Sequence, residues 1–292
     1  MSYLDPIQRC NRHQIDRFLA FFIQQTLVGW LRPEFACRLL DQWPNWFQQE
    51  RRGIHLNPQL NTFAKRSSAL QEITQALHQQ ELIHNLHGEL YPITANNRSQ
   101  ALCQLDRSAA PYFGIRAFGQ HLNGYVKQHG EIKLWLGRRA LDRWHAPGKL
   151  DNMVAGGLPI NISLEDNLAK ECAEEATLSR ELAQQAQPVG AISYCRESKE
   201  GLKQDLLYCY DLELPTDFIP HGSDGETESF QLYSLDEVAD IVQNSDELKL
   251  NCNLVIIDFL IRVGYITPDH PDYLAIINGL HQPFPQMSHP EA

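Results

Sequence analysis

The spacing of apolar and polar positions divides the chain into a first part rich in helix patterns and a second part in which strands alternate with helices. Within residues 1–110, apolar side chains recur at helical spacing over 16–22, 33–40 and 67–78. We therefore expect this segment to form a mainly helical α+β domain.

The pattern changes at residue 112. Strict alternation on either side of the turn-prone segment 127–130 predicts a β-hairpin. A helix pattern then begins near Ser163, and the later apolar stretches 189–195 and 205–212 are typical of strands. Strands interleaved with helices indicate an α/β fold.

The end of the chain contains two further helix patterns, at 248–263 and 271–280, separated by a turn that contains proline. No internal repeat or long linker is evident. We therefore predict three parts: an N-terminal domain, a central α/β domain, and a C-terminal helix with a tail. Their ranges are 1–110, 111–265 and 266–292.

Composition narrows the classes of function. With 43% hydrophobic and 21% charged residues, the chain is globular rather than disordered or fibrous. Twenty-five Lys and Arg face 36 Asp and Glu, which gives a net charge of -11 and disfavours nonspecific binding to nucleic acid or an anionic membrane. No apolar run approaches the roughly 20 residues of a membrane helix. Because the chain is negatively charged overall, an anionic ligand would need a bound cation to offset the repulsion.

Cysteine usage and the N-terminus both favour a cytoplasmic protein. The seven cysteines show neither CxxC pairs nor the spacing of a zinc site. The first ten residues lack the features of a secretory signal.

The helix that begins at Ser163 carries the most specific chemistry. Ser163 followed by Asp166 is similar to a capping box, and residues 164–176 contain no Gly or Pro. At about 100° per residue, Glu171, Glu174 and Glu175 share one edge of this helix. Neighbouring like charges destabilise a helix, and a divalent cation bound through hard carboxylate oxygens would remove that cost. A solvated acidic face is the alternative.

The segment AGGLPINISLEDNLAKECAEEATL resembles the Nudix box of the Nudix hydrolases. Aligned on the helix, the matching positions are Gly156, Glu171, Cys172, Glu174, Glu175 and Leu178. The resemblance implies a Nudix-type α/β/α sandwich with a mixed sheet. It also implies a site for Mg²⁺ or Mn²⁺ formed by Gly156, Glu171, Glu174 and Glu175.

Three positions depart from the Nudix pattern. Ile162 stands where the loop glutamate belongs, Lys170 replaces the arginine, and Thr177 replaces the second glycine. The glutamate and the arginine normally support each other, so the metal-binding residues are retained while their supporting pair is lost. Glu165, in the first helical turn, is a candidate substitute for the loop acid.

A narrower resemblance covers nearly the whole chain. DNMVAGGLP and KECAEEA, preceded by PYFGIRAFGQHLNGYV and LWLGRR, are similar to the Nudix subgroup found beside, or fused to, thiamine pyrophosphokinase. It implies hydrolysis of thiamine diphosphate, preferentially of its oxidised oxo and oxy forms, to the monophosphate and phosphate. Two alternatives stay open: hydrolysis of a nucleoside diphosphate derivative such as ADP-ribose, and a catalytically weak Nudix-like binding module, which the lost supporting pair would favour.

Catalytic and substrate-binding candidates complete the hypothesis. Besides Glu171, Glu174 and Glu175, the loop acids Glu226 and Glu228 are candidates for a base or an additional ligand, with a solvated loop as the alternative. The substrate-binding candidates are Arg116, His121, Asn123, Arg138, Arg139 and Lys149. The expected partner is a small-molecule diphosphate rather than nucleic acid or a membrane, and a homodimer stays open.

Overall fold

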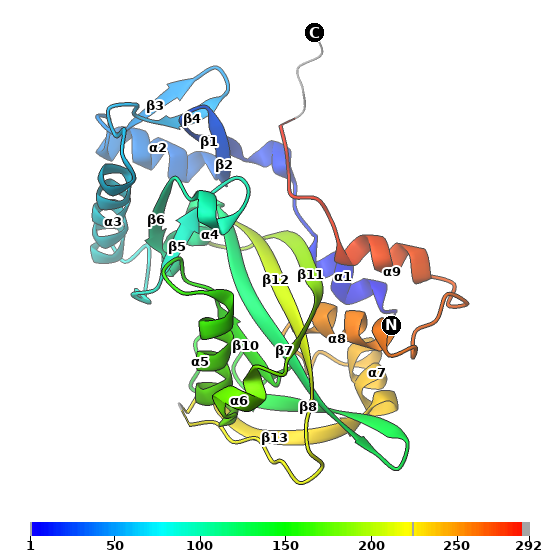
Figure 1. The fold of residues 1–292 in the computed structure, drawn as a ribbon. Helices are drawn as coiled ribbons and strands as arrows, with labels where there is room; N and C mark the ends of the chain where they lie inside the picture. The colour runs from blue at the N-terminus through cyan, green and yellow to red at the C-terminus, as the bar shows by residue number, and fades with distance from the viewer. Residues whose placement is uncertain (1, 224, 288–292) are drawn as a thin grey trace.

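A seven-stranded mixed sheet forms the centre of the computed structural model, which describes residues 2–223 and 225–287 (Figure 1). Its main path runs β11-β12-β7-β8-β13, with β10 paired to β7 and β9 paired to β8. Strand β12 is parallel to β7, whereas the other pairs are antiparallel, so the expected mixed sheet is confirmed. The strands are β7 (Arg116–Gln128), β8 (Glu131–Arg139), β9 (Leu150–Asn152), β10 (Val154–Gly157), β11 (Gln187–Glu197), β12 (Leu202–Glu213) and β13 (Thr227–Ser234).

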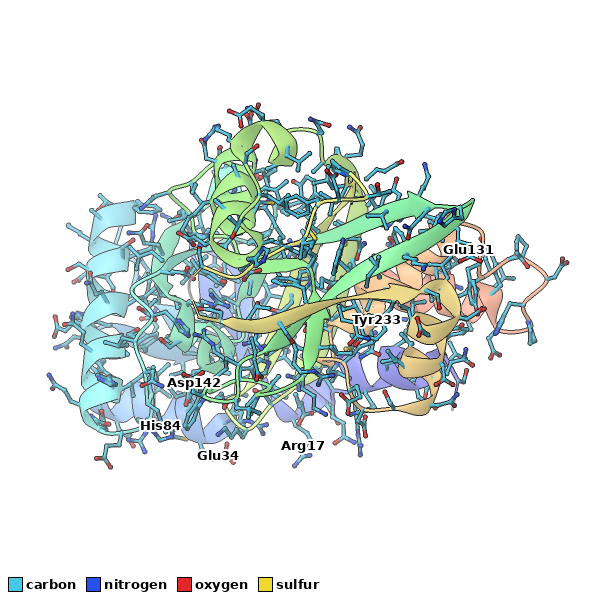
Figure 2. All side chains as sticks on the ribbon, turned by 90° about the horizontal axis from the view of Figure 1, so that it is seen from below. Arg17, Glu34, His84, Glu131, Asp142 and Tyr233 are labelled. Carbon is cyan, nitrogen blue, oxygen red and sulfur yellow. The ribbon has the colours of Figure 1, made fainter. Side chains whose placement is uncertain are left out.

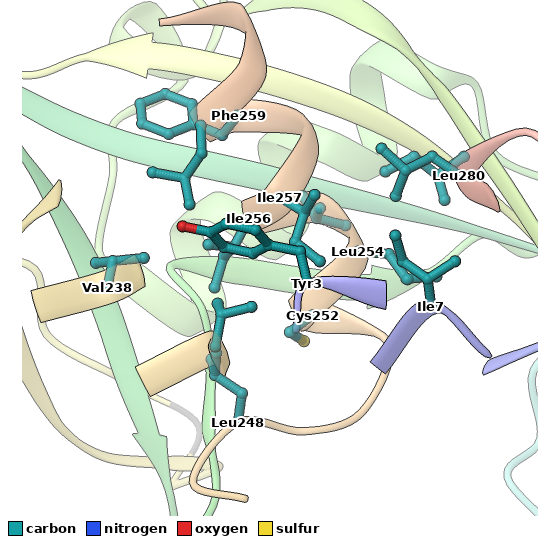
Figure 3. Packing of buried hydrophobic residues seen from close by; sticks show 14 of the residues in the cluster. Tyr3, Ile7, Val238, Leu248, Cys252, Leu254, Ile256, Ile257, Phe259 and Leu280 are labelled. Carbon is teal, nitrogen blue, oxygen red and sulfur yellow. The ribbon is translucent and has the colours of Figure 1, made fainter. Parts of the chain in front are cut away.

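Helices cover both faces of this sheet, as expected for an α/β/α arrangement. On one face, apolar residues of α5 pack against Leu122 and Val126 of β7 and Leu212 of β12. On the opposite face, α8 and its neighbours pack against β11 and β12 (Figure 3). The covering helices are α5 (Leu164–Ala176) and α6 (Arg180–Ala183) on the first face, and α1 (Leu4–Cys10), α7 (Leu235–Asn244), α8 (Cys252–Arg262) and α9 (Tyr273–Leu280) on the second.

The predicted elements of the second part of the chain are confirmed. The β7–β8 hairpin turns at His129 and Gly130, both with positive φ. Helix α5 begins after Ser163, whose hydroxyl accepts a hydrogen bond from the Asp166 amide. The helix predicted over 248–263 begins later, at Cys252.

The N-terminal part differs from the mainly helical expectation. It contains a four-stranded sheet, in the order β2-β1-β4-β3, and a two-stranded sheet, β5-β6. Its strands are β1 (Leu19–Ile23), β2 (Thr26–Leu31), β3 (Phe47–Glu50), β4 (Gly53–Leu56), β5 (Leu90–Ile93) and β6 (Cys103–Asp106). Its helices are α2 (Pro33–Gln42), α3 (Phe63–Gln79) and α4 (Ala110–Phe113), with short 3₁₀ turns at Ile15–Arg17, Arg98–Gln100 and Arg107–Ala109.

The helix expected over 16–22 is wrong for an identifiable reason. Residues 19–31 form an antiparallel hairpin whose turn residues, Gln24 and Gln25, both have positive φ. Glycine or asparagine normally marks such a turn, so two glutamines gave no turn signal. Without a turn signal between them, the apolar residues of the two strands gave a spacing similar to that of a helix.

The first helix packs away from the N-terminal sheet. Tyr3, Ile7 and Cys10 belong to the same buried cluster as α8 and α9 (Figure 3). Helix α1 therefore packs with the central part of the chain, although it precedes the domain boundary proposed near residue 110.

The last part of the predicted tail, 288–292, lies outside the described residues. None of the helices described is long and apolar enough to cross a membrane.

Thr177 shows how α5 ends without the glycine of the Nudix pattern. Its φ is 53° and its ψ is 33°, the left-handed conformation in which glycine is favoured at the end of a helix. The Thr177 hydroxyl donates a hydrogen bond to the His221 carbonyl at 2.5 Å. This bond offsets the strain of a β-branched residue in that conformation.

Substitutions at Thr177 separate these two contributions. Thr177→Val keeps the strain and removes the hydrogen bond, so we expect it to lower the free energy of unfolding by about 1 kcal/mol. Thr177→Gly removes both the strain and the bond and should leave stability nearly unchanged. Urea unfolding of both variants tests this expectation, and equal stability of the valine variant and wild type would contradict it.

Candidate active site

The carboxylate edge of α5, consisting of Glu171, Glu174 and Glu175, lies against strand β10. Glu175 Oε2 accepts a hydrogen bond from the Ala155 amide at 2.7 Å. A Cβ atom at Gly156 would lie 2.3 Å from Glu171 Cδ, so only glycine leaves room for this carboxylate. Gly156 therefore shapes the site through the side chain that it lacks.

Burial and mutual repulsion act on these acids. The pKa of Glu175 is raised to about 8, mainly by burial, with Asp151 and Glu171 adding to the shift and the Ala155 amide opposing it. Burial also raises the pKa of Glu171. A positive charge placed here would stabilise the ionised forms.

The edge already holds one positive charge. Lys170 Nζ lies 3.3 Å from Glu171 Oε1 and 3.2 Å from Glu174 Oε2. These hard oxygen donors, together with the space left by Gly156, fit a divalent cation. Glu171, Glu174 and Glu175 are the residues that would hold it.

A second cluster of potential metal ligands does not fit an ion. Ligand atoms of His121, Asp151 and Cys252 lie within 4.8 Å of one another. However, Asp151 Oδ2 already accepts hydrogen bonds from Lys249 Nζ at 2.8 Å and from Arg139 Nη1 at 3.0 Å, so two cationic side chains occupy the place of an ion. Burial raises the pKa of the Cys252 thiol well above its usual range, so it stays a hydrogen-bond donor rather than a thiolate ligand.

Asp151 instead joins three elements through its buried charge. Burial opposes ionisation of its carboxyl, but Lys249, His121 and Arg139 lower the pKa more strongly, so that the group stays charged. Cys252 Sγ donates to Asp151 Oδ1 at 2.6 Å. The segments carrying β8, β9 and the start of α8 are therefore connected beside the carboxylate edge.

A cavity of about 890 Å³ opens beside the carboxylate edge and is lined by both parts of the chain. Its size suits a small-molecule ligand. From the N-terminal part come Ile83, His84, Asn85, His87, Glu89, Tyr91, Arg107, Ser108 and Tyr112. From the central sheet come Ala117, Gly119, His121, Arg139, Tyr194, Arg196, Lys203 and Asp205.

The rim of the cavity joins the two parts of the chain. The centroid of the exposed Trp144 ring lies 5.8 Å from the centroid of the His84 ring. Lys199 Nζ lies over the same tryptophan ring, 5.6 Å from its centroid. Figure 2 shows His84 of the N-terminal part and Asp142, which is on the loop of Trp144, both toward the lower left of the view. Trp144 is therefore placed to contact a ligand that enters.

Residues of the N-terminal part contact the loop before α5, where the supporting pair of the Nudix pattern is missing. Arg98 donates to the carbonyl oxygens of Pro159 and Ile162 and thereby holds the loop before α5. Arg107 Nη1 pairs with Glu89 Oε2 at 2.9 Å and lies beside Gly157. Glu165 does not take this role, because it faces Arg180 and Gln184.

The structure brings only some of the substrate-binding candidates to the cavity. His121, Arg139 and Lys149 line it. His121 is buried and its Nδ1 lies 2.8 Å from Asn152 Oδ1, while Lys149 Nζ donates to the Asp246 carbonyl.

The other candidates lie elsewhere. Arg116 donates to the Asn96 carbonyl and stacks over Phe284, and Arg138 pairs with Glu247. Asn123 is buried and donates to Asp211, because at this point α8 rather than the cavity covers the sheet. Glu228 is exposed outside the cavity, whereas Glu226 lines it and pairs with Arg143 at 2.6 Å.

Sequence reasoning missed several cavity residues: Glu89, Arg107, Arg196, Lys203, Asp205 and Lys249. They come from segments far apart in the chain, and no local spacing connects them. The alternation along β12 did place Lys203 and Asp205 on one face, which was the available signal.

Comparisons with known proteins cover nearly the whole chain. Residues 2–117 match a family model described as a domain of unknown function, DUF4743. The chain is 39% identical to Nudix hydrolase 20, chloroplastic, of Arabidopsis thaliana over 96% of its own length and 77% of that protein. It is 40% identical to Nudix hydrolase 24, chloroplastic, of the same plant, again over 96% and 77%.

A solved structure of a C. elegans Ap4A hydrolase complex is also similar, at 16% identity and a TM-score of 0.38, over 51% of this chain and 99% of that one. Both plant relatives are named chloroplastic. A cytoplasmic location of this chain therefore stays a prediction.

Replacement of Asp151 tests its role as the buried connection. Asp151→Asn would leave Lys249 and Arg139 buried without a countercharge, so we expect a loss of about 3–5 kcal/mol in the free energy of unfolding. Asp246→Asn breaks the exposed Arg9–Asp246 pair and serves as the control, with little change in Tm. Equal Tm changes in the two variants would contradict this assignment.

Proposed function

The chain belongs to the Nudix hydrolase family, and we propose that it is the member that removes the terminal phosphate of thiamine diphosphate or of its oxidised oxo and oxy forms. The family acts on diphosphate bonds and generally uses divalent metals, so the chain is an enzyme of that class. The observation that carries the proposal is that the carboxylate edge of α5 and several cationic side chains line the same cavity.

Different residues around this cavity would bind the metal, bind the phosphate and hold the loop before α5. Glu171, Glu174 and Glu175 would hold Mg²⁺ or Mn²⁺, which when bound neutralises diphosphate oxygens and activates water. Arg107 is placed beside Gly157, where its guanidinium can bind and orient a phosphate. Arg98 keeps the preceding loop in place, so the carboxylates are positioned before substrate enters.

Electrostatics around Lys203 favour an anionic substrate whose ring is uncharged. The Asp205 carboxylate raises the pKa of Lys203, yet burial and the charges of Arg196, Arg107 and Lys249 lower it overall. Three cationic side chains, those of Arg107, Arg196 and Lys249, thus act on Lys203 in this part of the cavity. The neutral thiazolone ring of the oxo form suits these charges better than the cationic thiazolium that thiamine diphosphate and its oxy form share, which supports the oxo form as a substrate.

The resemblance to the subgroup associated with thiamine pyrophosphokinase supports the same substrate. ADP-ribose hydrolysis and a binding module without turnover are the competing proposals. A panel distinguishes them: phosphate release from thiamine diphosphate and its oxo and oxy analogues, and AMP release from ADP-ribose, each with and without Mg²⁺. We expect metal-dependent turnover that favours the thiamine compounds, whereas binding without turnover at saturating Mg²⁺ would favour the module.

Single substitutions on α5 test the carboxylate edge. Glu174→Gln or Glu175→Gln should lower kcat about 100-fold or more and weaken the increase in Tm that Mg²⁺ gives the wild type. Glu165→Gln is the matched control on the same helix, because its side chain faces Arg180, and it should retain activity. Unchanged turnover in the Glu174 and Glu175 variants would refute the assignment.

Gly156→Ala tests the close approach of α5 and β10. The new methyl group would displace the flexible Glu171 carboxyl rather than the backbone, so we expect Tm to change little while kcat falls about 100-fold. Gly137→Ala, on β8, adds a methyl group away from the site and should leave kcat near the wild-type value. Retention of full activity by Gly156→Ala would show that Glu171 need not occupy its present position.

A further inference from the structure

Arg196 and Lys203 form a pair of cationic side chains on the sheet side of the cavity. They lie opposite each other on the antiparallel strands β11 and β12, so their side chains share one face of the sheet. Both residues line the cavity. Like charges directly opposite each other destabilise a sheet, and an anion between them would offset that cost.

Other cations of the cavity are paired with acids. Arg139 and Lys249, for example, both pair with Asp151. Among residues 2–223 and 225–287, neither Arg196 nor Lys203 forms an ion pair or a side-chain hydrogen bond. Unpaired cationic side chains that line a cavity indicate a ligand of opposite charge.

Asp205 is the acid on the same face of β12, two positions after Lys203, and it does not neutralise the pair. Its charge raises the pKa of Lys203, but burial and three cations, Arg196 among them, lower that pKa more. The Asp205 carboxyl also accepts a hydrogen bond from the Tyr194 hydroxyl of β11. Asp205 is thus already engaged by a neighbouring strand.

His145 is close enough to feel the same charges. It is exposed on the loop between β8 and β9, and it lines the cavity together with Arg196 and Lys203. Desolvation by the surrounding protein lowers the pKa of His145 to about 4, with further contributions from Lys203, Lys249, Arg196 and Arg139. The ring is therefore neutral at pH 7 and can donate a hydrogen bond to an anion.

These groups fit a phosphate. Hydrogen bonds between cationic donors and phosphate oxygens are short and strong, with arginine binding through its planar fork and lysine as a point charge. Without a bound cation, the carboxylate edge of α5 would repel the same anion. The phosphate would therefore bind on the β11–β12 side.

The cationic pair shares the cavity with the carboxylate edge. Strand β7 separates β12 from β10 and presents the small residues Ala117 and Gly119 to the cavity. A substrate whose diphosphate lies at α5 has room to extend its organic part over β7 toward β12. Phosphate bound at Arg196 and Lys203 would occupy that path.

We propose that Arg196 and Lys203, with His145 beside them, form a phosphate-binding site that is separate from the carboxylate edge of α5 and needs no metal. Inorganic phosphate is a product of the proposed diphosphohydrolase reaction, so the enzyme would be inhibited by its own product in competition with substrate. That consequence rests on the proposed function, whereas the site itself does not.

Calorimetry with inorganic phosphate in the presence of EDTA tests the site without metal. We expect wild type to bind phosphate, and Lys203→Met and Arg196→Met to raise its Kd about 10- to 100-fold, as for the loss of one hydrogen bond to a charged group. Methionine keeps a long side chain and removes one of two repelling charges. The Tm of both variants without phosphate should therefore equal or exceed that of wild type.

Two control variants locate the bound phosphate. Lys127→Met removes an exposed lysine that pairs with Glu213 outside the cavity, and it should leave the Kd unchanged. Glu174→Gln, on α5, should also retain phosphate binding in EDTA. Loss of binding in the Glu174 variant would place the phosphate at the carboxylate edge and overturn the proposal.

A second ligand distinguishes free phosphate from phosphate on an organic molecule. The monophosphate of oxo-thiamine, the other product of the proposed reaction, is titrated under the same conditions. If inorganic phosphate binds, the free product is a ligand; if only the monophosphate binds, the site takes phosphate as part of the organic product. Wild type that binds neither compound, or equal Kd values in wild type and both methionine variants, would overturn the proposal.

NMR titration of the His145 ring provides an independent readout. Bound phosphate should raise the pKa of His145, because its negative charge opposes the surrounding cations. An unchanged pKa at saturating phosphate would remove His145 from the site.

Kinetics test the consequence for the reaction. Added phosphate should raise KM without lowering kcat in wild type, and this effect should shrink in Lys203→Met. Absence of turnover on every diphosphate of the panel would refute the proposed function, while the calorimetry in EDTA would still decide whether the phosphate site exists.

Discussion

The site depends on the contact between α5 and the short strand β10. Two features of β10 produce this contact. The Ala155 amide donates a hydrogen bond to Glu175, and the absence of a side chain at Gly156 leaves room for the Glu171 carboxylate. The contact places acidic groups where burial disfavours their charge. The protein therefore holds these acids near one another at a cost, and a cation offsets that cost.

The N-terminal part holds the loop of the box, whose usual supporting pair is absent. In this chain Ile162 and Lys170 occupy those positions, and support comes from residues more than 50 positions earlier in the sequence. Arg98 binds the loop through backbone carbonyls, so the side chain at position 162 is no longer needed for that purpose. The ion pair of Glu89 and Arg107 lies beside Gly157. The departures from the family pattern thus have a structural counterpart.

The sequence predicted what depends on local pattern. Alternation gave the β7–β8 hairpin, and the Ser163 cap gave the start of α5 with its three glutamates on one edge. It failed where the decisive contact is distant or the turn is unusual. Gln24 and Gln25 formed a turn that propensity disfavours, and Asp205 and Arg107 meet the site only through the pairing of strands and the packing of two sheets.

The shared lining of the cavity has a consequence for how this family diversifies. Because residues from the N-terminal part line the same cavity as the α5 carboxylates, selection for a new substrate can act on that part while α5 stays unchanged. Conversely, exchange of the N-terminal part between paralogues would transfer substrate preference and loop support together. The two parts are therefore expected to have been inherited as one evolutionary unit.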